Sequence, residues 1–129
     1  MASYQDPQIR AVSPYLLVPD GERTLRFLKD VFDARELHVA RDDKRLVHAT
    51  LAIGDGTLML GQPADPAGVQ PSALYIYVPD VDATYRKALA AGARSLSEPE
   101  DMPYGDRGAG VKDDEGTTWW IGTHLGRPS

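Results

Sequence analysis

Three histidines, His38, His48 and His124, are the side chains best suited to acid–base or metal chemistry near neutral pH. They lie on three separate segments, so a site of two histidines and one carboxylate requires the fold to bring those segments together. The chain has no cysteine, which excludes disulfides, thiolate metal sites and a thiol nucleophile. The remaining candidates for chemistry are nitrogen and oxygen groups.

His48 lies in the segment LVHATL, which has strand character. Alternation along a strand predicts that its side chain shares a face with Leu46 and Thr50. Two roles stay open for His48, a hydrogen-bonded structural role and contact with a ligand. In the second case, a metal site built from His48, Gln62 and a carboxylate is an alternative.

Arg107, in the segment YGDRG, is a candidate clamp for an anion or a carbonyl group. The alternative is an ion pair with a neighbouring aspartate such as Asp106 or Asp113. The segment 98–108 (EPEDMPYGDRG) predicts a long polar loop, and the carboxylates at 113–115 (DDE) are expected to be solvated. The sequence contains no glycine-rich phosphate loop and no strained nucleophile elbow.

The composition indicates one globular domain, with 129 residues, 42% hydrophobic and 26% charged, and a net charge of −5. The sequence has no basic patch, so we expect no nucleic-acid partner. No apolar run approaches the ~20 residues of a membrane helix, and the first ten residues lack the pattern of a secretory signal. We expect a soluble, cytoplasmic protein.

A repeat at an offset of 60 residues organises the chain. The segments 16–35 (LLVPDGERTLRFLKDVFDAR) and 76–94 (IYVPDVDATYRKALAAGAR) share VPD and a matching Thr and Arg, and the Gly-Thr pair at 56–57 recurs at 116–117. Each copy begins with a strand that ends at Pro-Asp, where Asp20 or Asp80 can cap the following helix. Two copies are typical of a pseudo-twofold domain and too few for a solenoid.

Each copy predicts a strand, a helix and three further strands. We expect strands at 14–18, 36–41, 46–53 and 57–60 in the first copy, and at 73–78, 95–98, 110–112 and 117–123 in the second. The helices are predicted from apolar stripes formed by Leu25, Leu28, Val31 and Phe32, and by Val81, Tyr85, Ala88 and Leu89. Module one then covers about 13–61, a linker (QPADPAGVQP) covers 62–71, and module two covers about 72–125.

Two such units in tandem resemble the vicinal oxygen chelate superfamily, which includes glyoxalase I, bleomycin-resistance proteins, fosfomycin-resistance enzymes and extradiol dioxygenases. The resemblance is carried by PYLLVPDGERTLRFLKDVFDA, VHATLAIGDGTLML, IYVPDVDATYRKALAAGA and YGDRGAGVKDDEGTTWWIGTH. It implies an α+β fold in which two tandem βαβββ modules form a cup-shaped mixed sheet with the helices on the convex side. It also implies a homodimer, as is common in that superfamily.

The resemblance further implies where metal ligands would stand, on the first and last strand of each unit. We locate these positions by their spacing from the Asp that follows each first strand and from the Gly that precedes each last strand. They are Ser13, Leu60, Ala73 and Trp120. None of these residue types is a good ligand, because zinc and nickel prefer imidazole or carboxylate, and magnesium and manganese prefer several oxygens. We therefore expect no metal and no other cofactor, as in the bleomycin-binding type.

If the carried-over positions face the cup, alternation places every second neighbour there as well. The resulting set is largely aromatic, with a few hydroxyls and one amide: Ser13, Tyr15, Leu17, Leu58, Leu60, Gln62, Ala73, Tyr75, Tyr77, Thr118, Trp120 and Gly122. Such a surface is typical of a small-molecule pocket, although small barrels also fill their interiors with packed side chains. Trp119 is expected to face the opposite way, beneath a helix.

The main hypothesis is a metal-free protein that binds or sequesters an aromatic or cationic small molecule in an aromatic cup. Its candidate ligand-binding residues are Tyr15, Tyr75, Tyr77, Trp120, Thr118, Gln62, His48 and Arg107. One alternative is a metal-dependent lyase, isomerase or dioxygenase of the same superfamily with a displaced metal site. Others are metal-free catalysis with Tyr75, Tyr77 or His48 as acid or base, and an interaction domain whose cup is filled.

Overall fold

The computed structural model describes residues 4–126 and has the expected α+β architecture. The chain divides between Gln70 and Pro71 into two compact units. The first contains β1 (Tyr15–Leu17), α1 (Gly21–Phe32), β2 (Arg35–Asp42), β3 (Arg45–Ile53), β4 (Gly56–Gly61) and a short 3-10 helix, η1 (Pro66–Gly68). The second contains β5 (Ala73–Tyr77), α2 (Val81–Ala90), β6 (Arg94–Asp101), β7 (Asp106–Lys112) and β8 (Thr118–His124). The predicted tandem βαβββ order is confirmed.

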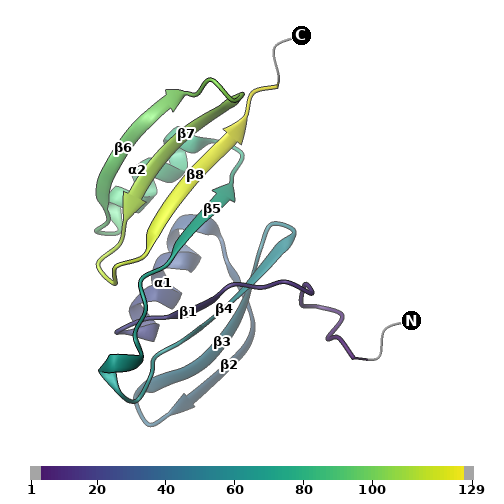
Figure 1. The fold of residues 1–129 in the computed structure, drawn as a ribbon, viewed down its shortest axis with the longest axis vertical. Coiled ribbons are helices and arrows are strands. Elements are labelled where there is room, and N and C mark those ends of the chain that lie inside the picture. The colour runs from purple at the N-terminus through teal and green to yellow at the C-terminus, as the bar shows by residue number, and fades with distance from the viewer. Residues whose placement is uncertain (1–3, 127–129) are drawn as a thin grey trace. The chain divides into compact units, whose positions relative to one another are not determined.

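Each unit folds into a four-stranded mixed sheet with one helix against it (Figure 1). The strand orders are β1-β4-β3-β2 and β5-β8-β7-β6. The first and last strands of each unit pair in parallel, and the other neighbours pair antiparallel. A parallel pair needs a long crossover, which the helix and the two strands after it provide. The face of each sheet that lies opposite its own helix is called the open face below.

Both helices begin at the aspartates that the repeat predicts as caps. The side chain of Asp20 accepts a hydrogen bond from the Arg23 N–H at 3.3 Å, and that of Asp80 accepts one from the Ala83 N–H at 3.2 Å. Gly92, with a φ of 101°, follows the end of α2 with a positive φ, as glycine commonly does after a helix. The repeated VPD sequence therefore marks the same structural event twice, the end of a strand and the start of a helix.

The core of each unit lies between its helix and its sheet. The predicted stripe of α1 is buried, with Leu25, Leu28, Val31 and Phe32 at most 6% exposed. In α2, Val81, Tyr85 and Ala88 are buried as predicted, but Leu89 is 38% exposed and Thr84 is buried instead. The reason is helical phase, because positions 81, 84, 85 and 88 share one face of a helix and position 89 lies beside that face. Each large apolar side chain buried in this way stabilises its unit by about 1.5–3 kcal/mol.

A register shift in the β2–β3 pair separates Leu46 from His48. Ala40 pairs with His48 while the next residue, Arg41, pairs with Leu46, so β3 carries one extra residue at this point. Leu46 is fully buried and lies against Gly21 at the start of α1. The prediction that Leu46 and His48 share a face is therefore wrong, because the bulge reverses the alternation between them.

The segment 98–108 is a β-hairpin, so the prediction of a long loop there is wrong. β6 continues to Asp101, β7 begins at Asp106, and only four residues connect them. The Met102 N–H donates to the Asp106 carbonyl at 2.7 Å, which closes the turn. Pro99 is tolerated because β6 is an edge strand and its pairing with β7 is irregular between Ser97 and Glu100.

Within the part of the chain that the structure describes, neither helix has the length and apolar character that crossing a bilayer requires.

The two capping aspartates provide a test of the repeat. Replacing Asp20 or Asp80 by alanine removes one hydrogen bond from a helix N-terminus and should lower the free energy of unfolding by about 1 kcal/mol in each case. Urea unfolding measures this loss. Asp30→Ala, at an exposed position inside α1, is the matched control and should change stability by less than about 0.5 kcal/mol. Equal losses in all three variants would contradict the capping role.

Candidate functional site

The open face of the second unit carries the aromatic residues that the sequence placed in a cup. Tyr75 and Tyr77 alternate along β5, and Tyr75 pairs with Trp120 on β8. All three side chains are at least 40% exposed, whereas Trp119 and Ile121 on the opposite face of β8 are fully buried beneath α2. The expected position of Trp119 is therefore confirmed.

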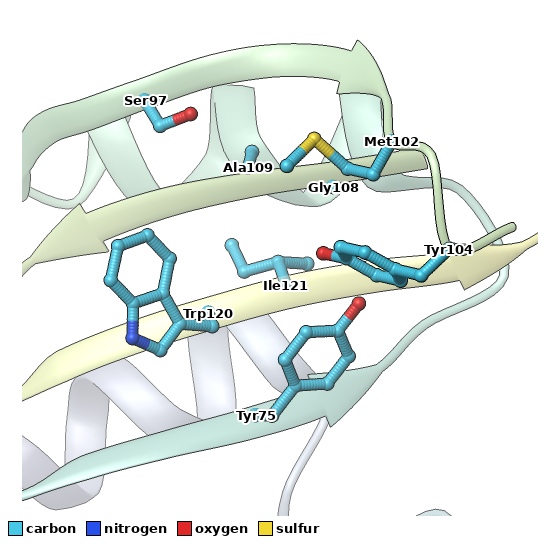
Figure 2. A pocket seen from close by; sticks show the side chains of 8 residues that line it. All are labelled: Tyr75, Ser97, Met102, Tyr104, Gly108, Ala109, Trp120 and Ile121. Carbon is cyan, nitrogen blue, oxygen red and sulfur yellow. The ribbon is translucent and has the colours of Figure 1, made fainter. Parts of the chain in front are cut away.

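A pocket of about 250 Å³ opens on this face of the second unit. Figure 2 shows Trp120, Tyr75 and Tyr104 on one side of β7, and Ser97 and Met102 across that strand. The complete lining consists of Tyr75, Ser97, Met102, Tyr104, Gly108, Ala109, Trp120 and Ile121. Thr118 shares the open face with Trp120 but lies outside this lining. The aromatic walls suit a flat apolar group, because pockets for small molecules combine such walls with a few polar atoms.

Glycines on β7 and β8 make room for the aromatic rings. A side-chain carbon at Gly110 would overlap the six-membered ring of Trp120, and one at Gly122 would overlap the Tyr75 hydroxyl group. At Gly108, in contrast, an added carbon would meet its nearest neighbours at 3.6 Å, an ordinary contact distance. Two of the three glycines are therefore required by the rings that lie on them. The sequence offered a signal for this surface, namely glycine at alternate positions 108 and 110 of one strand.

Asp106, a buried carboxylate at the start of β7, organises the polar edge of this site. Its Oδ2 accepts hydrogen bonds from the hydroxyls of Tyr75 at 2.7 Å and Tyr77 at 2.8 Å, and its Oδ1 is 3.0 Å from His124 Nδ1. The hydrogen bond with His124, and after it the one from Tyr75, holds the pKa of Asp106 below its usual range. From the sequence, Asp106 is predicted only as a partner for Arg107, and its hydrogen bonds with Tyr75, Tyr77 and His124 are not predicted.

The hydroxyl of Tyr75 is held in its neutral form. Burial raises the pKa of Tyr75, and hydrogen bonding to Asp106 and Tyr104 raises it further. A phenol with a raised pKa keeps its proton near neutral pH and so has little of the phenolate form that could act as a base, and Tyr75 is therefore suited to hydrogen bonding and stacking. This arrangement does not favour the alternative in which Tyr75 acts as a catalytic base.

Arg107 lies on the α2 side of the second sheet. Its guanidinium donates to Asp82 on α2 at 2.7 Å and to Asp101 on β6 at 3.0 Å. Of the two predicted alternatives, the structure shows the ion pair, but with Asp82 and Asp101 in place of Asp106 or Asp113. The guanidinium is directed away from the pocket because Arg107 follows Asp106 on the strand and points to the other face.

Asp113 is buried, so the prediction that the carboxylates at 113–115 are solvated is wrong for this residue. Its Oδ2 accepts a hydrogen bond from the Trp119 indole N–H at 2.8 Å, and its Oδ1 accepts from the backbone of Glu115 and Thr117. Asp113 therefore shapes the β7–β8 turn and anchors the buried Trp119.

In the first unit, the open face carries a polar cluster. The Tyr15 hydroxyl lies 2.9 Å from His48 Nδ1, and His48 Nε2 lies 2.8 Å from the Thr50 hydroxyl. The ring of exposed His38, on β2, is centred 6.0 Å from that of His48. Burial lowers the pKa of His48, and the neighbouring His38 lowers it further. The bulge in β3 thus directs His48 to the open face.

Gln62 does not join this cluster. Its side-chain oxygen accepts a hydrogen bond from the Gly21 N–H at 3.0 Å, at the start of α1. Both ring nitrogens of His48 are already hydrogen-bonded to Tyr15 and Thr50. The structure therefore does not bring His48 and Gln62 together as ligands of a displaced metal site.

The strand register corrects one of the four positions carried over for metal ligands. Tyr15 pairs with Met59 in the first unit, as Tyr75 pairs with Trp120 in the second, so Met59 and not Leu60 is the equivalent of Trp120. Leu60 and Leu58 are buried on the α1 side. Equivalent residues are 60 positions apart on the first strands of the two units but 61 apart on the last strands. The Gly-Thr pairs at 56–57 and 116–117 are 60 apart, so the sequence did not show this change.

The side chains at the corrected positions do not fit a divalent metal ion. They supply an indole, a methyl group, a thioether and one hydroxyl, from Trp120, Ala73, Met59 and Ser13, and the hydroxyl is hydrogen-bonded to Thr57 at 2.7 Å. Such a set lacks the imidazole or carboxylate groups that zinc, nickel, manganese or magnesium require. Among residues 4–126, no three His, Asp or Glu side chains lie close enough together to hold a metal ion.

Residues 9–121 match the model of the Glyoxalase/Bleomycin resistance protein/Dioxygenase superfamily. The chain is 37% identical over 124 residues to an uncharacterized protein of Mycobacterium tuberculosis, an alignment that covers 87% of this chain and 73% of the relative.

Among solved structures, TioX from Micromonospora sp. ML1 is similar, with a TM-score of 0.74, 28% identity, and coverage of 89% of this chain and 100% of that one. The fosfomycin resistance protein FosX from Listeria monocytogenes, solved with Mn(II) and sulfate, has a TM-score of 0.69 and 15% identity, with coverage of 89% and 90%. At 15% identity, the likeness to FosX concerns the fold alone.

Alanine substitution of the glycines tests how the pocket is built. Gly110→Ala should displace the Trp120 ring, increase quenching of tryptophan fluorescence by acrylamide, and cost about 1–3 kcal/mol of stability through overpacking. Gly108→Ala, two residues away on the same strand and facing the same pocket, is the matched control and should leave quenching unchanged. Identical quenching in the two variants would show that Gly110 does not seat the ring.

The charge of Asp106 predicts a pH dependence of stability. The pKa of Asp106 is lower in the folded protein than in the unfolded chain. The ionised carboxylate therefore contributes stability that is fully present above about pH 4, where an unfolded aspartate is ionised. This stability is lost as the pH falls through the pKa of Asp106 in the folded protein. Asp106→Asn should therefore lose less stability than the wild type between about pH 7 and pH 3, measured by urea unfolding. Asp30→Asn is the control and should follow the wild type. Parallel curves for wild type and Asp106→Asn would contradict the interpretation.

Proposed function

Because the chain belongs to the Glyoxalase/Bleomycin resistance protein/Dioxygenase superfamily, and its aromatic pocket is built without metal-ligating side chains, we propose that it is a metal-free small-molecule-binding protein of that superfamily. Its ligand is an aromatic or cationic small molecule, which the protein binds or sequesters. In this proposal the protein acts in the cytoplasm as a homodimer, as the family resemblance implies.

The pocket of the second unit is the observation that carries this proposal. Its walls are two tyrosines, one tryptophan and one methionine, and no lysine or arginine lies among its lining residues. Aromatic faces attract flat rings and cations, and the thioether adds a polarizable contact. The ionised Asp106 next to Tyr75 adds negative charge at the edge of the site. An aromatic or cationic ligand therefore suits this surface better than an anion does.

The residue types at the family's ligand positions support binding without a metal. A tryptophan and an alanine in the second unit, and a methionine and a hydrogen-bonded serine in the first, leave a divalent ion without adequate ligands. Trp120 in particular places an aromatic surface where a metal-dependent relative would need a carboxylate or an imidazole. This substitution favours stacking with a ligand over Lewis-acid catalysis at that position.

Binding of a planar cationic dye such as acridine orange tests the proposal. The dye should quench tryptophan fluorescence, and Trp120→Ala should weaken its binding about tenfold, equivalent to about 1.4 kcal/mol, when affinity is followed by dye polarisation. Tyr4→Ala, which changes an aromatic side chain that is 87% exposed outside the pocket, is the control and should bind as the wild type does. Equal affinity of wild type and Trp120→Ala would contradict a site on this surface.

Calorimetric titration with zinc, nickel, manganese and iron(II) tests the metal-free part separately. We expect no binding at one ion per chain. Micromolar binding at that stoichiometry would overturn this part of the proposal without affecting the dye measurement.

A further inference from the structure

The first unit contains a hydrogen-bonded chain of three side chains that leads from its interior to its surface. Thr50 is 1% exposed, His48 is half-buried, and Tyr15 is 50% exposed. Separations of 2.8 Å between Thr50 and His48, and of 2.9 Å between His48 and Tyr15, connect them without a gap. The three side chains, here called the Tyr15 relay, come from two strands, β1 and β3, that are not neighbours in the sheet.

The second unit shows that the fold does not need this relay. It has the same strand order and the same pairing, yet glycines 108 and 110 stand where the first unit has His48 and Thr50. Tyr75, the equivalent of Tyr15, donates to Asp106 instead. The same strand pairing therefore forms without a histidine and a threonine at these positions, so the sheet does not require them.

The arrangement of the relay matches that of an activated hydroxyl. A hydroxyl, a base that contacts it, and a third group that orients the base are the parts of such a site. Here Tyr15 supplies the hydroxyl, His48 the base and Thr50 the orienting group. When His48 Nε2–H donates to Thr50, Nδ1 is left as the acceptor for the Tyr15 hydroxyl.

The surroundings of His48 favour its neutral form, in which the base is available. Burial and the neighbouring His38 on β2 lower the pKa of His48. The other titratable group that faces it is Tyr15 on β1, while β4 contributes only Met59 and Gly61. Among residues 4–126, the hydrogen bonds of His48 are to Tyr15 and Thr50 and to no carboxylate, and a ligand that becomes an anion beside Tyr15 would supply a negative charge that stabilises the imidazolium.

We propose that the Tyr15 relay is an acid–base site of the first unit, built from other residues than the aromatic pocket, that accepts the proton of an acidic hydroxyl group on a phenol or an enol. Tyr15 contacts the ligand, and His48 and Thr50 act through it as positioning residues. The ligand O–H bond breaks and its proton forms a new bond to the Tyr15 oxygen. The original Tyr15 proton moves to His48 Nδ1, and the electron pair stays on the ligand oxygen. The products are a bound phenolate or enolate and an imidazolium of opposite charge.

4-Nitrophenol is a suitable probe, because its ionised form has a visible absorption band that its neutral form lacks. Added to the full chain at a pH below its own pKa, it should show an increased phenolate band. Tyr15→Phe removes only the hydroxyl and should reduce this increase at least about tenfold, because a hydrogen bond to a charged oxygen is lost. Tyr4→Phe is the matched control and should behave as the wild type does.

Two further measurements separate this site from the aromatic pocket. Trp120→Ala should keep the phenolate band if the relay is the site. A band that is lost in Trp120→Ala and kept in Tyr15→Phe would overturn the relay and support the pocket. In wild-type protein, the ring nitrogens of His48 should shift toward their imidazolium values in 15N NMR as the probe is added. An unchanged His48 signal, or no increase in phenolate absorbance, would also overturn the proposal, whether or not Tyr15→Phe folds.

Discussion

The packing of one helix against one four-stranded sheet decides which side chains of each unit can meet a ligand. Leu16 and Leu60 in the first unit, and Trp119 and Ile121 in the second, are at most 1% exposed because they face α1 or α2. Strand alternation then sends their immediate neighbours to the open face. Tyr15, Tyr75 and Trp120 lie on the open face for this reason, and a shift in register changes which residues of a strand reach that face.

The two copies of the unit have kept the same backbone and acquired different open faces. In the second unit, Gly110 on β7 and Gly122 on β8 leave room for the rings of Trp120 and Tyr75, and these two rings help to line a pocket. In the first unit, His48 and Thr50 fill the corresponding positions and hydrogen-bond to Tyr15. The repeated unit thus carries an aromatic open face in one copy and a polar, hydrogen-bonded open face in the other.

Buried or paired carboxylates fix the geometry around the pocket. Asp106 orients two tyrosines and His124, and Asp113 holds Trp119 and the β7–β8 turn. Arg107 connects α2 to the edge strand β6 through Asp82 and Asp101. Because this arginine is paired on the α2 side, the pocket keeps an aromatic lining, with the carboxylate of Asp106 hydrogen-bonded to Tyr75 at its edge.

The sequence by itself determined the order of elements, the helix caps and the aromatic character of β5, because these depend on local propensity and on a repeat that can be read directly. It also predicted that Trp119 faces a helix and that Trp120 faces the opposite side of the sheet. Only the tertiary structure decided the orientation of His48, the exchange of Leu60 for Met59 on the open face, and the part played by Asp106. A bulge of one residue and a repeat offset that changes from 60 to 61 leave no local trace, yet each reverses the face of a strand. Hydrogen bonds between residues about thirty positions apart, such as that of Tyr75 with Asp106, exist only once the strands have paired.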